Sequence, residues 1–436
     1  MDVRLNLVDR LFLLLDGVQG PPSLNLYALT VEGDWDYEVL RRAVAGLLAE
    51  QPLLRTRAHR TAFGLKRRLL ADEPVENVFE VGPAGPGVGH DNEAERAFMR
   101  RPLDLATQPP VRILARPGRI VMGIHHSVAD GIGGYFVLDR LAAHYQALLA
   151  GTPVEPPPVA PPRHYGSYFG RFTPAERRRA LSGMGNVLRE MLLPLGPYAT
   201  FGDLPLPARG EFAWRELVLS ADHVTQLRAV ARGRGGTLND LLLAATAVAG
   251  CATWPNAPDR PVLVMVPASL REGAAVDMTN RVAELPILLP GEVCQEFGAT
   301  FDLAKTLTPL ARDRGVAFAR IFQYGLASKL PPPLVRAIVR KSLDRPENHA
   351  LTYVFSNTGI LDPQPRDFGP VRVLSVAGMP PLTMPPGLGI VAATARGKLT
   401  ITVAWADPAL ARERIDAFCQ DLLITLDRLV REPLPA

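Results

Sequence analysis

A proline-rich stretch near the middle of the chain most constrains its fold, because it separates two segments that each mix strands and helices. Residues 151–210 contain eleven prolines. Proline fixes φ and removes a backbone donor, so we expect this stretch to connect two folded parts, with one helix over 174–191. The 436 residues are then expected to form an N-terminal lobe (1–155), a connector (156–210) and a C-terminal lobe (211–436).

The first lobe alternates short apolar runs with segments whose apolar residues recur at helical spacing. We expect strands over 24–32, 66–70, 78–81, 111–115 and 120–124, and helices over 37–50, 92–99 and 136–149. Arg116-Pro117-Gly118-Arg119 has the turn chemistry of a hairpin between the last two strands.

The second lobe repeats the mixed pattern. We expect strands over 212–219, 261–266, 281–289, 351–355, 371–376, 388–395 and 399–405, and helices over 221–232, 237–250 and 409–430, with further helices up to about 343. The sequence therefore predicts an α/β protein of the two-layer α+β kind.

Composition excludes several classes of protein. The chain is 47% hydrophobic and 21% charged, as in globular proteins, and its net charge of +4 disfavours a dedicated nucleic-acid binder. Cys251, Cys294 and Cys419 show no metal-binding or disulfide spacing. The apolar run 11–15 is too short to span a membrane, and no signal peptide is visible. We expect a cytoplasmic protein without a transmembrane segment.

The densest group of chemically active residues is His125-His126-Ser127-Val128-Ala129-Asp130-Gly131, directly after a predicted strand. Adjacent side chains of an extended segment point to opposite faces, so one imidazole can enter a cavity while the other packs into the lobe. A neutral imidazole can take a proton from an alcohol or amine and return it later. The glycines that follow allow close backbone approach before the next helix begins.

Simpler interpretations compete with this one. An isolated histidine at a strand end is usually a buried structural residue. His126 and Asp130 have no third metal ligand nearby, so we expect no metal. The glycines lack the ending of a phosphate-binding loop, and no GxSxG nucleophile elbow occurs. Residues 177–179 are three arginines that fit a solvated helix face, with a carrier-protein or phosphate contact as the alternative.

The seven-residue string resembles the HHxxxDG motif of the condensation-domain-like acyltransferase superfamily. That superfamily includes chloramphenicol-acetyltransferase-like enzymes, nonribosomal-peptide condensation domains, polyketide-associated acyltransferases and wax ester synthase/diacylglycerol acyltransferases. Other segments resemble it in the same order: residues 11–15 (the opening), 51–55 (HPxLR), 101–105 (PLDL), 237–242 (TxNDxLLA), 267–271 with Asn280 (PxSLR…N), and Ser356-Asn357 (SN).

The resemblance implies two chloramphenicol-acetyltransferase-like lobes in a V, with a tunnel along their interface. It implies that His126 is the general base beside Gly131, and that Asp130 is structural and paired with an arginine. Arg271 is the partner we expect, with Arg55 and Arg281 as alternatives. It further implies a thioester donor, on coenzyme A or a carrier-protein phosphopantetheine, and no permanently bound cofactor.

Substrate contacts are expected from His125, Ser356 and Asn357, of which the last two are equally well a turn after a strand. A hydroxyl of Ser356, the Asn357 amide or backbone N–H groups can stabilise the oxyanion. Asn239-Asp240 is interpreted as a helix cap. Two departures leave the subfamily open: DFGWG is present only as Asp367-Phe368-Gly369-Pro370, and HPxLR begins with Gln51.

The leading hypothesis is an acyltransferase, acting as a monomer, that forms an ester or amide with a small-molecule alcohol or amine. A nonribosomal-peptide-type amide-forming enzyme and a non-catalytic carrier-protein-docking module are alternatives. A glycerophosphate acyltransferase using His125 and Asp130 as its HxxxxD pair is disfavoured, because the acidic downstream motif is absent and His126 is unexplained. Sequence does not identify the acyl chain, the acceptor or the carrier.

Overall fold

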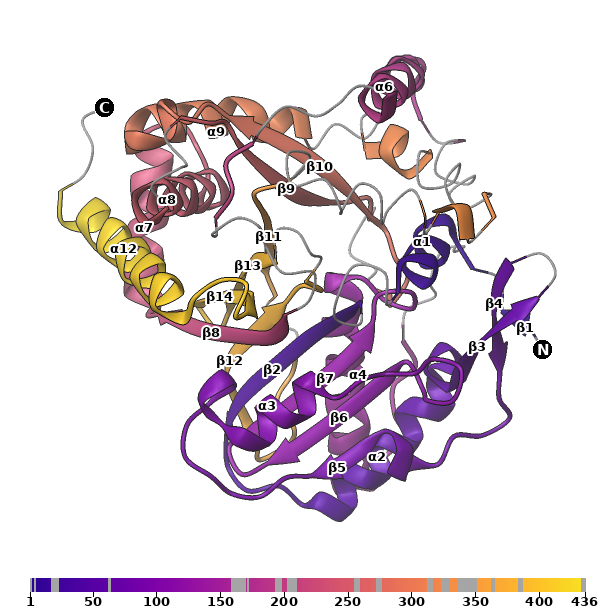
Figure 1. The fold of residues 1–436 in the computed structure, drawn as a ribbon. Coiled ribbons are helices and arrows are strands. Elements are labelled where there is room, and N and C mark those ends of the chain that lie inside the picture. The colour runs from indigo at the N-terminus through magenta and orange to yellow at the C-terminus, as the bar shows by residue number, and fades with distance from the viewer. Residues whose placement is uncertain are drawn as a thin grey trace.

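The chain forms two α/β lobes, which meet in a V with one lobe above the other in Figure 1. The computed structural model describes residues 2–3, 5–16, 23–61, 64–157, 170, 172–192, 198–201, 210–254, 259–271, 277–311, 317–322, 330–331, 333–335, 337, 351–361, 365–382 and 387–432. The lobes confirm the predicted two-layer fold class. Much of the predicted connector lies outside these residues, so the division at 155 and 210 stays a proposal.

A five-stranded sheet forms the first lobe. Its strands, in order, are β12 (Arg372–Met379), β2 (Leu24–Glu32), β7 (Arg119–His125), β6 (Val111–Arg116) and β5 (Phe79–Val81). Helices α2 (Tyr37–Glu50) and α4 (Gly131–Ala150) share its core. Strands β6 and β7 are buried at every position, because the helices cover one face and the second lobe covers part of the other.

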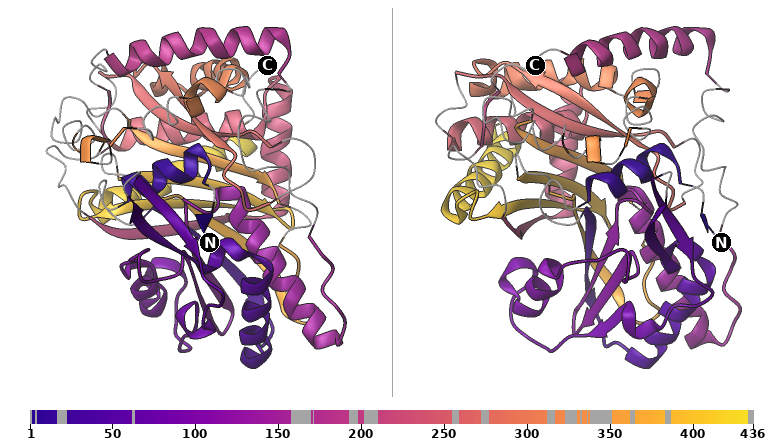
Figure 2. Two further views of the ribbon diagram at one scale, coloured as in Figure 1. Left: turned by 90° about the vertical axis from the view of Figure 1, so that its right-hand side faces the viewer. Right: turned by 45° about the vertical axis from the view of Figure 1, so that its right-hand side comes forward.

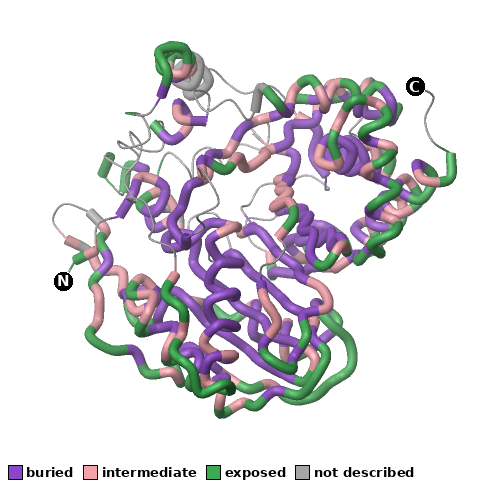
Figure 3. Tube along the Cα trace, turned by 180° about the vertical axis from the view of Figure 1, so that it is seen from behind, coloured by how far each residue is buried: buried purple, intermediate pink, exposed green. Residues whose placement is uncertain are grey.

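A six-stranded sheet forms the second lobe. Its strands, in order, are β10 (Val282–Leu289), β9 (Val262–Ser269), β11 (Tyr353–Ile360), β13 (Leu388–Ala395), β14 (Lys398–Asp407) and β8 (Glu211–Leu219). Its core includes residues of α7 (Ala221–Gly233), α8 (Leu238–Thr253), α9 (Phe297–Ala311) and α12 (Arg412–Arg431). Helix α8 is apolar on nearly all sides because the sheet and its neighbouring helices enclose it. Figure 3 shows the resulting distribution, with buried segments inside each lobe and exposed ones at the rim.

Smaller elements complete the fold. They are β1 (Asp2–Val3), β3 (Thr56–Thr61) and β4 (Gly64–Leu69), which form a third sheet, helices α1 (Leu7–Leu15), α3 (Glu93–Arg100) and α6 (Pro174–Leu192), and 3-10 turns over Pro52–Arg55, Val75–Asn77, Gly89–Asp91 and Val293–Gln295. Helix α1 lies between the lobes in all the ribbon views (Figures 1 and 2). Its Val8 belongs to the same core cluster as Leu270 and Leu285 of the second half, so α1 fixes one lobe against the other.

The lobes are also joined by a strand exchange. β12 follows β11 in the chain but pairs antiparallel with β2, from Arg372↔Glu32 to Met379↔Leu26. A core cluster spans this junction and includes Leu26 together with Trp214 and Ala404 of the second sheet. The two sheets therefore share apolar core, which favours a fixed interlobe geometry.

One local expectation was wrong, and two elements were not predicted. Helix α4 begins at Gly131 rather than 136, so the motif glycines lie within its first turn. Strand β3 and helix α1 had no predicted counterpart. Gly134 is required in α4 because a Cβ there would lie 2.1 Å from the Tyr27 ring. A glycine that permits close packing inside a helix has the same sequence signature as a loop glycine.

Candidate active site

The HHxxxDG string spans the junction between β7 and α4. His125 is the last residue of β7, and Asp130 is the N-cap of α4, with its Oδ1 accepting from the Gly133 N–H at 2.8 Å. The intervening turn is fixed by Asn25, whose amide donates to the Ala129 carbonyl at 3.0 Å. These contacts hold the two histidines in a fixed orientation at the end of the sheet.

A cavity of about 120 Å³ lies where the two lobes meet, and His126 lines it. The first half of the chain contributes Phe12, Tyr27, Gly131 and Tyr135, and the second half contributes residues of β9, β10, β11, β12 and β13. Most of these side chains are apolar, as is usual in small-molecule sites. The cavity has the predicted interlobe location; a tunnel that opens at two ends stays a prediction.

The His126 imidazole is held on its face and on one edge. It stacks on the Phe12 ring of α1, with centroids 3.7 Å apart and planes 13° from parallel. Its Nδ1 lies 3.1 Å from Asn280 Oδ1. Only 7% of the residue is exposed. An imidazole held in this way has little freedom to rotate, which favours directed proton transfer.

The contacts of Asn280 determine the tautomer of His126. The Asn280 amide nitrogen donates to the His126 carbonyl at 2.5 Å and to Asp9 Oδ1 at 2.7 Å. The remaining amide oxygen is an acceptor, so Nδ1 of the neutral His126 ring must carry the hydrogen. Nε2 then has the lone pair, as a general base requires.

The environment of His126 keeps its ring uncharged. Burial, opposed by the nearby Asp130 carboxylate, lowers the pKa of His126 to about 4 from its ordinary 6.5. The ring is therefore neutral at pH 7 and available to accept a proton.

We expect this pKa to control the pH dependence of both activity and stability. The acid limb of kcat/KM should fall near pH 4, with a constant rate from about pH 5.5 to 8. The unfolded chain binds the His126 proton below about pH 6.5, so His126 lowers stability progressively as the pH falls from 6.5 towards 4. Initial rates measured at each pH report the effect on activity. Urea unfolding across the same pH range reports the effect on stability. An acid limb at pH 6.5 would contradict the assignment.

His125 has the opposite orientation. It is fully buried, does not line the cavity, and its Nδ1 accepts from the Ser127 N–H at 3.1 Å. Its Nε2 lies 3.2 Å from the Asp16 carboxylate. The two rings point to opposite sides because successive side chains of an extended segment alternate between its faces. His125 therefore has its polar contacts within the protein and lies outside the described cavity lining, and the substrate contact expected for it stays a prediction.

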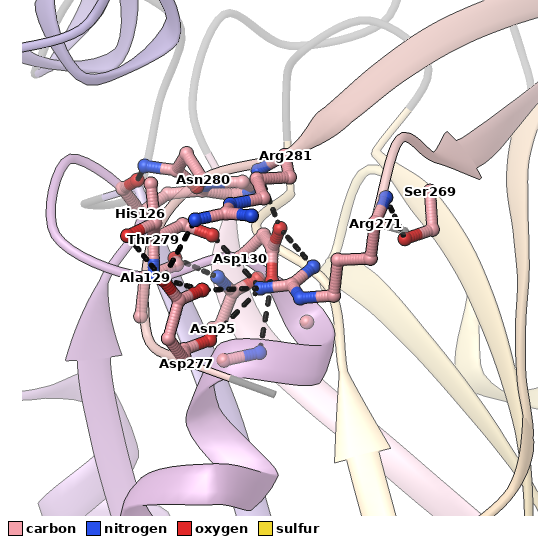
Figure 4. Close-up of polar contacts among 12 residues, drawn as sticks. Asn25, His126, Ala129, Asp130, Ser269, Arg271, Asp277, Thr279, Asn280 and Arg281 are labelled. Carbon is pink, nitrogen blue, oxygen red and sulfur yellow. Dashed lines mark hydrogen bonds and ion pairs between the residues drawn. The ribbon is translucent and has the colours of Figure 1, made fainter. Parts of the chain in front are cut away.

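Asp130 and Arg271 form a buried, two-point ion pair across the lobes (Figure 4). Arg271 Nη1 donates to Oδ2 at 2.7 Å, and Nη2 donates to Oδ1 at 2.8 Å. Burial alone would raise the pKa of Asp130, but Arg271 and backbone N–H donors lower it below its ordinary value. The carboxylate is therefore charged, and both of its oxygens accept hydrogen bonds from Arg271 and from backbone N–H groups.

The other two candidate arginines bind elsewhere. Arg55 donates to the Ala71 carbonyl, and the guanidinium of Arg281 pairs with Asp277 at 2.8 Å. Arg281 contributes only its backbone N–H to Asp130, at 2.8 Å. Arg271 is therefore the arginine that pairs with the motif aspartate.

Arg271 also connects the ion pair to His126. Its Nη2 donates to the carbonyls of Asp277 at 3.0 Å and Thr279 at 2.8 Å, in the segment that leads into Asn280. Figure 4 shows Asp130, Arg271 and Asn280 within one network of contacts. The ion pair thereby positions the amide that orients the imidazole.

The two residues of the Ser356-Asn357 segment, both in β11, have different surroundings. Ser356 lines the cavity, whereas Asn357 does not. Asn357 Oδ1 instead accepts from the Gly359 N–H at 2.9 Å, next to a break in the register with β13. For Asn357, the contact with Gly359 fits the local turn that was the alternative to a substrate contact. Of the two residues, Ser356 is the one placed to contact a molecule bound in the cavity.

Sequence reasoning did not assign roles to Phe12, Asn25 or Asn280. Asn280 had a signal, since it belongs to the segment quoted for the resemblance. Asn25 is a polar residue inside an apolar strand, which is a signal for a specific buried hydrogen bond. Phe12 had none, because its contact with His126 depends on how α1 lies between the lobes.

The described residues offer no group of three or more His, Cys, Asp or Glu side chains suited to a metal ion. The three cysteines are buried and free. Within the described part of the chain, every helix is too short or too polar to cross a membrane.

Solved structures share this fold over the full length of the chain. The first condensation domain of the CDA synthetase has a TM-score of 0.70 and 18% identity, covering 100% of this chain and 98% of that domain. The starter condensation domain of rhizomide synthetase RzmA, in complex with C8-CoA and Leu-SNAC, has a TM-score of 0.67 and 15% identity, covering 99% and 95%. These comparisons show that the chain has a condensation-domain fold.

Sequence relatives agree with the fold. The chain is 31% identical over 259 residues to the AMB antimetabolite synthetase AmbE of Pseudomonas aeruginosa, covering 55% of this chain and 12% of that protein. It is 26% identical over 278 residues to a putative diacylglycerol O-acyltransferase of Mycobacterium tuberculosis, covering 56% of this chain and 57% of that protein. No family model matches the chain. The predicted resemblance to the condensation-domain-like acyltransferases is confirmed.

Proposed function

We propose that the protein is an acyltransferase that moves an acyl group from a thioester to a hydroxyl or amine. One observation carries the proposal: His126 is a neutral imidazole that lines an interlobe cavity and whose Nδ1 hydrogen is fixed by Asn280. The donor is a coenzyme A or carrier-protein phosphopantetheine thioester. Relatives support the assignment, since one solved neighbour holds C8-CoA and a curated relative is a putative acyltransferase.

His126 acts first as a base and then as an acid in the proposed reaction. Nε2 takes the proton of the acceptor as its oxygen or nitrogen forms a bond to the thioester carbonyl carbon. The tetrahedral intermediate then collapses, the carbon–sulfur bond breaks, and the leaving thiolate takes the proton back from Nε2. The thioester is already activated, so no covalent intermediate with the protein is needed.

The oxyanion of the intermediate needs a donor in the same cavity. We assign this role to the Ser356 hydroxyl, which lines the cavity together with His126. Backbone N–H groups at the start of α4 are the alternative, because a helix N-terminus favours negative charge. The Asn357 amide is dropped because that residue lies outside the cavity lining.

Turnover of the purified chain tests the proposal. The donors are octanoyl-CoA and octanoyl-phosphopantetheine on a carrier protein, and the acceptors are a panel of alcohols and amines. Thiol release and product mass report acyl transfer, and the product distinguishes an ester from the amide of a nonribosomal-peptide-type enzyme. Carrier binding without product for any acceptor would instead indicate a docking module.

Gly131 offers a direct test of the cavity. A Cβ at this position would meet no atom within 4 Å, and the residue lines the cavity. We expect Gly131→Leu to fill the cavity and lower kcat/KM about tenfold or more, while changing the free energy of unfolding by about 1 kcal/mol or less. Gly185→Leu is the matched control, since Gly185 is an exposed helical glycine with equally open surroundings. Equal activity of both variants would place substrate elsewhere.

A further inference from the structure

A buried carboxylate close to the candidate base has no part in the reaction described above. Asp9 of helix α1 is 0% exposed and does not belong to the described lining of the cavity. Its Oδ1 accepts a hydrogen bond from the Asn280 amide nitrogen at 2.7 Å. Burying a carboxylate is costly unless its oxygens are hydrogen-bonded. The groups that meet Asp9 must therefore be donors, and this requirement extends to the amide beside His126.

The beginning of α1 holds Asp9 in place. Asn6 is the N-cap of the helix, and its side chain accepts from the Asp9 N–H at 2.8 Å, while Asp9 Oδ2 accepts from the Asn6 N–H at 2.9 Å. This reciprocal arrangement is a capping box. The Asn6 amide nitrogen also donates to the Asn280 carbonyl at 3.0 Å. The first turn of α1 is therefore bonded to both the backbone and the side chain of Asn280.

The contact with Asp9 favours one of the two orientations of the Asn280 side-chain amide. A carboxylate and a carbonyl oxygen only accept hydrogen bonds, so the group that faces Asp9 Oδ1 and the His126 carbonyl is the NH2 group. Turning the amide over would place its oxygen against both acceptors and its NH2 group against His126 Nδ1. The neutral ring would then carry its hydrogen on Nε2, which would lose the lone pair that a general base needs.

Asp9 and Phe12 act on the same ring from the same helix. They are three residues apart, so they lie on one face of α1. Phe12 stacks on the His126 ring, with centroids 3.7 Å apart. One face of α1 thus restrains the plane of the imidazole through Phe12 and, through Asn280, the nitrogen that carries its hydrogen.

We propose that Asp9 is a positioning residue that acts through Asn280 to keep the lone pair of His126 on Nε2. This role rests on the proposed function in treating Nε2 as the base, but the tautomer itself can be measured without any turnover. A capping role alone would stabilise α1 in either orientation of the Asn280 amide. It would therefore leave the tautomer of His126 unaffected, and the two roles can be separated by experiment.

The ring tautomer of His126 is the direct test. Nitrogen NMR distinguishes a ring nitrogen that carries a hydrogen from one with a lone pair, and the signals of His126 are those missing from His126→Ala. Near pH 7, where the ring is neutral, the wild-type protein should be almost entirely in the Nδ1–H form. Asp9→Asn replaces one oxygen by an NH2 group, which must face either the Asn6 N–H or the Asn280 NH2 group. Turning the Asn280 amide over relieves this conflict.

We therefore expect about half or more of the His126 rings in Asp9→Asn to carry their hydrogen on Nε2. The kcat for octanoyl transfer should fall about two- to tenfold, in proportion to the Nδ1–H fraction that remains, with KM unchanged. Asp9→Ala removes the acceptor without adding a donor. Its Nε2–H fraction should lie between those of wild type and Asp9→Asn, so this variant tests the same role if Asp9→Asn does not fold.

The matched control is Asp240→Asn. Asp240 has the same position in the capping box of α8, is 3% exposed, and lies outside the described cavity lining. This variant should weaken the fold but leave the tautomer of His126 and kcat unchanged. A wild-type ring in the Nε2–H form, or a folded Asp9→Asn protein with the wild-type tautomer, would overturn the role of Asp9 alone. The expected change of tautomer without acyl transfer by the wild-type protein would reject the proposed function alone.

Discussion

Replacing His126 by alanine is expected to lower kcat for acyl transfer by about 10²–10⁴-fold, the usual contribution of a general base. The variant loses Nε2, while Asn280 keeps its bonds to Asp9 and to the His126 backbone carbonyl. The loss should therefore fall on kcat rather than on KM. The ring transfers a proton, and it is only one of many residues that line the cavity. Steady-state thiol release with octanoyl-CoA measures it.

The matched control is His223→Ala, which removes a partly buried histidine of α7 that lies 3.6 Å from the Asp427 carboxylate and outside the described cavity lining. That variant should retain full activity. Added imidazole should restore part of the His126→Ala rate, because a small base can enter the space left by the ring. A His126→Ala rate within a few-fold of wild type would refute the general-base assignment.

The motif and its immediate chemistry could be predicted from sequence because they depend on neighbouring residues. Alternation along an extended segment implied that His125 and His126 point to opposite sides, and the structure shows this. The sequence did not say which side is the cavity for each ring. That depends on which face of the sheet meets the second lobe.

Long-range partners were harder to predict. The Asp130–Arg271 pair joins residues 141 positions apart, and it was expected only through the resemblance. Strand β12 was expected with its sequence neighbours, but it pairs with β2 on the first lobe. Apolar alternation indicates a strand without naming its partner. The start of α4 was missed because its glycines resemble a loop, whereas the Asp130 cap and tight packing favour a helix.

Replacing Arg271 by alanine is expected to destabilise the fold by about 3–5 kcal/mol, the usual cost of leaving one partner of a buried ion pair. Asp130 is only 2% exposed and would lose its guanidinium partner while it is still buried. The loss should also slow acyl transfer, because Arg271 holds the backbone of Asp277 and Thr279 beside Asn280. Urea unfolding measures the first effect, and thiol release measures the second.

Two comparisons separate the buried charge from lost packing. The double variant Asp130→Asn/Arg271→Met removes both charges, and asparagine still caps a helix, so it should recover most of the stability. Arg372→Ala breaks an exposed pair with Glu32, at 2.6 Å, and should cost less than about 1 kcal/mol. A loss for Arg271→Ala as small as that for Arg372→Ala would contradict the role of the pair.

The pH dependence of the Arg271→Ala variant provides an independent check. In the wild-type protein the pKa of Asp130 is lowered, so its contribution to stability is present above its ordinary value of 3.8 and is lost as the pH falls through the folded value. Without Arg271, burial raises the pKa of Asp130 instead, and the cost of the charge disappears once the carboxyl is protonated. The stability difference between the two proteins should therefore shrink as the pH falls towards 4. A difference that stays constant with pH would mean that Arg271 stabilises the fold by packing, and that Asp130 does not depend on it for its charge.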